Sequence, residues 1–247
     1  MVIATSFRQA PLLSMPPASE TMTWVSVTEA ELKGVWGKLS HLRGLLRTSS
    51  QPNNIGWQLA EEYYFLAEFG SPQQIPDGER EVLEDGFGRL RADGGGGPLA
   101  HYYFMLNKIG MHHTPSAEDI ALMKTDLGKR GMQARLVAQA HHRLRSIGIS
   151  TEFPEGLEDR LRESLNSERH RGNAWEIALH HFYMQSLGMT NLLTPADEVI
   201  LQNDLKLCRE HPEIPTHTSR EIVSVLLKLR RPATSQHEPM PPIKKLG

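Results

Sequence analysis

One eleven-residue segment recurs four times along the chain at nearly constant spacing. Its copies run from an alanine to a glycine and cover residues 60–70, 100–110, 138–148 and 178–188. The glycines follow one another at intervals of 40, 38 and 40 residues. Self-similarity at a fixed period of roughly 20–50 residues is typical of proteins built from stacked repeats. The spacing therefore predicts a repeat architecture with a period of about 39 residues.

Each copy has the pattern of an amphipathic helix that ends at its glycine. In the first copy, Leu59, Tyr63 and Leu66 are spaced by four and three residues, which places them on one face of an α-helix. The glycine supplies the left-handed conformation that ends a helix without strain. Downstream, Thr114-Pro115 and Thr194-Pro195 combine a capping hydroxyl with a proline, which predicts the start of a second helix. Each unit is therefore predicted to be a helical hairpin.

No run alternates with a period of two over enough residues to indicate a sheet. The predicted fold class is all-α, about ten helices in a right-handed stack of four to five helical hairpins, an α-solenoid or α-α superhelix. The predicted repeat domain covers residues 25–230, and its units lie at about 54–97, 98–131, 132–172 and 173–211. Helices at residues 28–47 and 219–229 are predicted to cap the two ends of the stack.

Three segments lie outside this helical pattern. Residues 1–24 carry few charges and several prolines, serines and threonines, and residues 231–247 hold four prolines. Both are predicted to be disordered tails. The four glycines at residues 94–97 are predicted to form a flexible linker between two hairpins, because no Lys-Ser or Lys-Thr follows them as in a phosphate-binding loop.

The layout of paired helices resembles the α-solenoid class, in which HEAT, armadillo and TPR-like hairpins stack side by side. Trp57, Ala60 and Tyr64 loosely resemble the first helix of a TPR, although TPRs repeat every 34 residues or so. The resemblance covers about residues 25–211 and concerns the architecture, not a particular family. It implies a non-enzymatic scaffold that binds a protein or peptide through a concave surface.

Candidate binding residues gather on the predicted first helix of each unit. They are aromatic, histidine and arginine side chains: Tyr63, Tyr64, Tyr102, Tyr103, His141, His142, Arg143, Arg145, His180, His181 and Tyr183. Tyrosine and arginine are favoured as anchors in binding surfaces. Arg143 and Arg145 also depart from the residues found at the same positions of the other copies, which favours a specialised surface for an anionic group. The alternatives are core packing for the aromatic residues and a solvated charged face for the arginines.

The histidines also suggest an enzyme. His141 and His181 occupy equivalent positions in neighbouring units, and Tyr63 and Tyr103 continue the same ladder. Helices that pack side by side would bring the two imidazoles within about 10 Å of each other. Adjacent histidines on one helix diverge by about 100°, and no His-Glu-x-x-His motif is present. The ladder is therefore predicted to pack the seam between units, with a metal- or acid/base-dependent enzyme as the alternative.

Composition narrows the class of partner. The chain has 27 Lys and Arg against 29 Asp and Glu, a formal net charge of −2, which disfavours nucleic acid and leaves a protein or peptide as the expected partner. No stretch reaches the roughly 18–20 apolar residues of a membrane span. The single cysteine, Cys208, fits a reducing, cytoplasmic compartment, and the polar leader is compatible with non-classical export. We expect no cofactor, metal ligand or catalytic residue, and the oligomeric state is left open.

Overall fold

The computed structural model describes residues 22, 24–48, 54–125, 127, 132–189, 193–212 and 219–230. This part of the chain holds ten α-helices and no strand, which confirms the predicted all-α class. The helices are α1 (Glu29–Arg47), α2 (Ile55–Glu68), α3 (Asp77–Ala92), α4 (Gly96–Lys108), α5 (Ala117–Thr125), α6 (Ala134–Ser146), α7 (Leu157–Arg171), α8 (Ala174–Ser186), α9 (Pro195–Glu210) and α10 (Ser219–Arg230). The predicted tails lie outside the described residues, apart from Met22 and Trp24, and Met22 is buried in the core.

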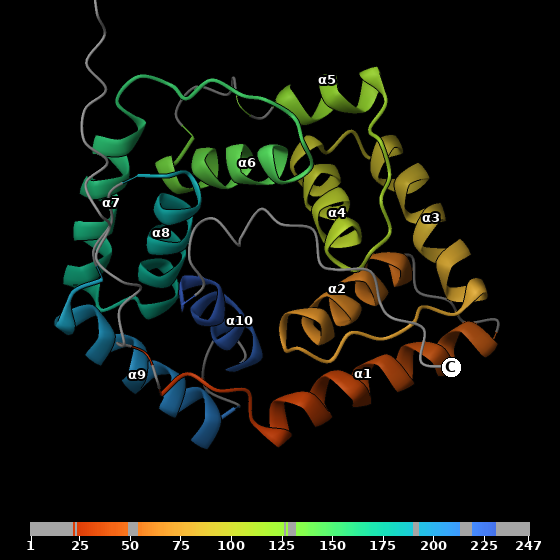
Figure 1. The fold of residues 1–247 in the computed structure, drawn as a ribbon, viewed down its shortest axis with the longest axis horizontal. Coiled ribbons are helices and arrows are strands. Elements are labelled where there is room, and N and C mark those ends of the chain that lie inside the picture. The colour runs from red at the N-terminus through yellow and green to blue at the C-terminus, as the bar shows by residue number, and fades with distance from the viewer. Residues whose placement is uncertain are drawn as a thin grey trace, which may run out of the picture.

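The helices are arranged as an outer and an inner ring (Figure 1). Helices α1, α3, α5, α7 and α9 lie outside, and helices α2, α4, α6, α8 and α10 lie inside. The inner helices contact one another in the order α2, α4, α6, α8 and α10, and α10 also contacts α2. The inner helices therefore close into a ring, whereas the ends of a linear stack would stay apart. Helix α10, predicted to cap the last unit, fills the place between α8 and α2.

Ion pairs join the two ends of the chain where the ring closes. Arg209 of α9 donates to the Glu31 carboxylate of α1 over 3.0 Å and to the Ser26 carbonyl oxygen over 2.7 Å. On the inner ring, Arg220 of α10 binds Glu62 of α2 at 2.6 Å. Both acids are buried, so each guanidinium supplies the partner that a desolvated carboxylate requires.

Helices α2, α4, α6 and α8 each end just before the glycine that the sequence predicts. Gly70 has a φ of 74° and Gly110 a φ of 83°, in the left-handed region that residues with a side chain rarely adopt. The N–H of Ser71 then donates to the Leu66 carbonyl oxygen over 2.8 Å, the bond that defines a Schellman cap. This cap turns the chain out of the inner ring toward the next outer helix.

One predicted outer-helix start is confirmed and another is wrong. Thr194 caps α9 as predicted: its hydroxyl accepts from the Asp197 N–H over 3.1 Å. Helix α5 begins later than Thr114-Pro115 predicts, because the Ser116 hydroxyl accepts from the N–H of Asp119 and caps the helix instead. Pro115 therefore precedes α5.

The glycines at residues 94–97 form the predicted connection only in part, because Gly94 and Gly95 lie between α3 and α4 whereas Gly96 and Gly97 belong to α4. Gly96 is the first residue of α4, and a Cβ atom on it would lie 2.2 Å from the Leu122 carbonyl oxygen of α5. At the start of α2, a Cβ atom on Gly56 would lie 2.8 Å from the Val82 carbonyl oxygen of α3. In both places the absence of a side chain lets the inner helix approach the backbone of the outer helix. Gly56 and Gly96 therefore serve close helix packing, not chain flexibility.

Candidate binding cavity

The tyrosine and histidine ladder lies at the seams between hairpins. In the second hairpin, the Tyr103 hydroxyl donates to the Asp119 carboxylate over 2.6 Å. Arg91, from the preceding outer helix, donates to both oxygens of that carboxylate over 2.7 Å. The hydrogen bonds from Arg91 lower the pKa of Asp119 to about 2, and burial beside this carboxylate raises the pKa of Tyr103 to about 12. We call this arrangement of an outer-helix acid, an arginine and an inner-helix side chain a seam cluster.

Seam clusters recur around the ring. Two further ones consist of Tyr63, Glu79 and Arg43, and of His181, Asp197 and Arg169. Where the ring closes, Arg209 and Glu31 form the same kind of arginine–carboxylate pair as in the seam clusters. In all four cases the acid is the third residue of its outer helix, where a carboxylate also favours the helix dipole.

The third hairpin departs from this arrangement. In α1, α3 and α9, an acid stands twelve residues before an arginine. In α7 the residue twelve positions before Arg169 is Leu157, which is buried. The His141 ring of this hairpin lies 2.8 Å from the Thr151 hydroxyl and so has a hydroxyl partner instead of a carboxylate. The ladder residues Tyr63, Tyr103, His141 and His181 thus contact side chains on the outer side of the inner ring, and their packing role stays a prediction.

All five described inner helices contribute side chains to one cavity of about 320 Å³. This volume is at the lower end of the roughly 300–1,000 Å³ typical of small-ligand pockets. Because residues of α2, α4, α6, α8 and α10 line it, the cavity lies inside the inner ring. We refer to it as the central cavity.

A closed belt of side chains surrounds the central cavity. The Tyr64 and Phe104 rings are 5.7 Å apart, Phe104 and His142 5.5 Å, and His142 and Phe182 4.9 Å. The Lys228 ammonium then lies 5.5 Å from the Phe182 ring and 4.8 Å from the Tyr64 ring. One residue from each inner helix takes part, so the belt runs once around the ring through aromatic and cation–π contacts.

Charged side chains lie among these rings. Arg135 forms an ion pair of 2.5 Å with Glu176, and Glu61 lies 3.4 Å from Lys38. Arg143 reaches the cavity from the last turn of α6, where burial lowers the pKa of its guanidinium below the ordinary value. His101 also lines the cavity, and burial holds its pKa well below the usual 6.5, so its imidazole is neutral at pH 7.

The predicted binding residues do not share one surface. Tyr64, His142, Arg143 and Tyr183 line the central cavity, whereas the ladder residues lie at the seams. His180 of α8 contacts the Glu176 carbonyl oxygen of its own helix and the Ser164 hydroxyl of α7. Arg145 is exposed, and its guanidinium lies 5.2 Å from the Phe153 ring. The two arginines predicted to share a surface therefore face different sides of α6.

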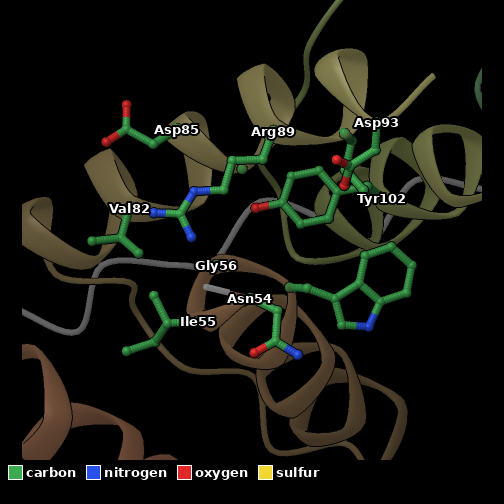
Figure 2. A pocket seen from close by; sticks show the side chains of 11 residues that line it. Asn54, Ile55, Gly56, Val82, Asp85, Arg89, Asp93 and Tyr102 are labelled. Carbon is green, nitrogen blue, oxygen red and sulfur yellow. The ribbon is translucent and has the colours of Figure 1, made fainter. Parts of the chain in front are cut away.

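Tyr102 belongs to a second, smaller pocket of about 110 Å³ between α2 and α3 (Figure 2). Its ring is stacked on Trp57, and its hydroxyl donates to the Leu83 carbonyl oxygen over 2.5 Å. A Cβ atom on Gly86 would lie 2.3 Å from that hydroxyl oxygen, so the glycine makes room for the tyrosine. We interpret this pocket as a packing feature, since its tyrosine already has a partner.

Sequence reasoning missed several cavity residues. Arg135 and Trp175 are the second residues of α6 and α8, upstream of the recurring segment, and Lys228 lies on α10, which lacks that segment. A signal was available, because Arg135 and Trp175 stand thirteen residues before the glycines that end their helical segments. Extending the repeat alignment upstream would have paired them.

The described residues contain no group of three histidine, cysteine, aspartate or glutamate side chains arranged to hold a metal ion. None of their helices combines the length and the apolar character that crossing a membrane requires. The enzyme built on His141 and His181 stays a prediction, to be tested by assaying bound metal in the purified protein and in the corresponding alanine variants.

Comparison with known protein families, curated proteins and solved structures finds no match for this chain.

Proposed function

We propose that this chain is a non-enzymatic helical-repeat protein that binds a protein or peptide partner at its central cavity. The observation that carries the proposal is the cavity itself, to which each inner helix contributes. Its lining combines aromatic rings with arginine side chains, the residue types that dominate binding energy in protein interfaces. The concave surface expected of a stacked-hairpin protein would then be the inside of the ring.

The same proposal treats the hairpins as copies of one unit with a period of about 39 residues. Arginines stand twelve residues after the acids in α1, α3 and α9, an interval that supports a common register. The belt, with one residue from each inner helix, supports it independently. In a repeat protein of this kind, residues that differ between copies provide specificity. The belt position is occupied by tyrosine, phenylalanine, histidine, phenylalanine and lysine in turn.

Peptide selection tests the proposal. A random peptide library displayed on phage is panned on the full chain, and the affinities of enriched peptides are measured by isothermal titration calorimetry. Ser224 lines the cavity and is 2% exposed, so Ser224→Phe fills part of the space. We expect this variant to weaken binding at least tenfold, while the added ring of Val199→Phe, at a side chain that is 55% exposed on α9, leaves binding unchanged.

Both variants are first checked for native helix content and melting temperature by circular dichroism. Should Ser224→Phe fail to fold, Trp175→Ala removes a cavity wall residue at the second position of α8 and serves in its place. Enrichment of no peptide, or of peptides that bind the wild type and both variants equally, would overturn the proposal.

A further inference from the structure

Arg143 stands apart from the other charged residues of the central cavity. The ionisable groups that act on its guanidinium are Tyr183, Tyr64 and Arg135, and none of them is a carboxylate. Among the residues that the structure describes, no acid lies within ion-pair distance of it. A guanidinium has five N–H donors and no acceptor, so its unfilled capacity is for an oxygen anion or another acceptor.

The remaining charges of the cavity nearly cancel. Its charged lining residues are Arg135, Arg143, Lys228, Glu61 and Glu221. Two of them also have partners outside the lining: Arg135 pairs with Glu176, and Glu61 pairs with Lys38. His101 is neutral and adds no charge. The cavity therefore has one more cation than acid, both when these two ion pairs are included in the count and when they are left out. A ligand group with a single negative charge would balance this excess.

We propose that the central cavity binds a carboxylate carried beside an apolar group, as at the C-terminus of a peptide that ends in an aromatic residue, and that Arg143 binds the carboxylate. This inference rests on the proposed function, because it specifies the chemistry of the ligand at that cavity. Arginine donates to a carboxylate through two parallel N–H groups, which gives such a site both strength and orientation.

The walls of the cavity favour the apolar part of such a ligand. Tyr64, Phe104 and Phe182 supply ring faces and edges from three of the inner helices, and aromatic rings attract one another at centroid distances of about 4.5–7 Å. A volume of about 320 Å³ suits one or two residues of a chain and not a folded segment. A peptide end brings a single negative charge and a side chain next to it, which matches both parts of the cavity.

The fold itself provides an energetic argument. Arg143 is half-buried, and a cation that loses part of its hydration without a counter-ion opposes folding, so an apolar side chain of similar length would be tolerated better. Residues that bind a ligand often lower the stability of the unliganded protein in this way. Arg143→Met is therefore expected to leave the melting temperature of the free protein unchanged or to raise it, which a purely structural arginine would not do.

Matched peptides test the inference. Acetyl-Gly-Gly-Phe with a free C-terminal carboxylate is compared with the same peptide as its C-terminal amide, by calorimetry and by the fluorescence of Trp175, which lines the cavity. We expect the acid to bind at least tenfold more tightly than the amide. Arg143→Met should weaken binding of the acid about 10- to 100-fold and remove the difference between the two peptides. Arg145→Met, an equal change of charge two residues away on the exposed side, should change neither.

Each outcome separates this inference from the proposed function. Equal binding of acid and amide, or equal losses in Arg143→Met and Arg145→Met, overturns the inference, while library peptides that still depend on Ser224 would keep the proposed function. Binding of free 3-phenylpropanoate through Arg143, without binding of any peptide, supports the carboxylate site and overturns the peptide partner. If Arg143→Met does not fold, Arg143→Gln, which keeps a polar side chain, is measured instead.

Discussion

Removal of the Asp119 carboxylate tests whether the seam clusters hold the ring together. The Asp119 side chain is 3% exposed, and it accepts two hydrogen bonds from Arg91 and one from Tyr103. Its pKa falls from 3.8 to about 2, which corresponds to roughly 2.5 kcal/mol at about 1.4 kcal/mol per unit. Because the Arg91 side chain is 46% exposed, solvent screening reduces the part due to the ion pair to about 1.5 kcal/mol.

Asp119→Leu also leaves the buried Tyr103 hydroxyl without its acceptor, which costs a further 1–3 kcal/mol or so. We therefore expect the variant to lose about 3 kcal/mol of unfolding free energy. Tyr103→Phe alone should lose about 2 kcal/mol, because a hydrogen bond to a charged acceptor disappears. The double variant should lose only about 1.5 kcal/mol and not the sum of about 5, since the ion pair is lost but no hydroxyl is left without an acceptor. The third hairpin, with Leu157 near the start of its outer helix, shows that a leucine fits this seam.

Urea denaturation followed by far-ultraviolet circular dichroism measures the four free energies of this cycle. Glu118→Leu, which removes the exposed acid one residue earlier in the same helix turn, is the control and should change little. Additive losses in the double variant would refute the reasoning, because they would mean that the tyrosine and the carboxylate stabilise the seam independently.

Three further predictions concern the ring as a whole. Gly96→Ala should lower the free energy of unfolding by about 2 kcal/mol, because its Cβ atom would collide with the backbone of α5. Gly37→Ala in α1 is the control: no atom lies within 4 Å of its Cβ position, so the same urea titration should show a free energy of unfolding raised by about 0.5–1 kcal/mol. The neutral His101 of the folded state has a lowered pKa, so the free energy of unfolding should be fully retained above pH 6.5. It should then fall by up to about 1.4 kcal/mol per pH unit below that value, and a His101→Phe variant that kept the full slope would contradict this. Arg209→Met should speed amide hydrogen exchange in the first turn of α1 but not in α5, measured by mass spectrometry, and uniform acceleration would argue against a local closure.

The helices could be predicted because local rules determine them. The helix pattern before Gly70 and the left-handed conformation of that glycine concern neighbouring residues alone. Closure of the ring depends instead on the pairing of Arg209 with Glu31, which are 178 positions apart, and on α10, which lacks the recurring segment. The twelve-residue interval between acids and arginines did hint at a common register. Only the structure reveals that the last arginine reaches the first acid.

The candidate site could be predicted in part for the same reason. Tyr63 and Tyr64 are chemically identical neighbours that point about 100° apart, one to a seam and the other to the central cavity. The sequence could not decide which of them faces inward, because both faces of an inner helix are buried. Arg143 was identifiable from its departure from the other copies, but the same reasoning grouped it with Arg145, which lies on the solvent side of α6.

The arginines of the seams show why Arg143 is informative. In the described part of the chain, acids bind Arg43, Arg91, Arg135, Arg169, Arg209 and Arg220. This fold therefore supplies a carboxylate to the arginines that pack between its helices, as the cost of burying an unpaired charge requires. Glutamate at the Gln139 position, one turn before Arg143 on α6, would offer such a partner within the same helix. Gln139 instead lies near the Tyr183 hydroxyl, and Arg143 keeps its charge facing the cavity. If the cavity were only an imperfection in packing, Gln139→Glu would stabilise the free protein without affecting any ligand, whereas a carboxylate site predicts that the same substitution competes with the ligand and weakens its binding.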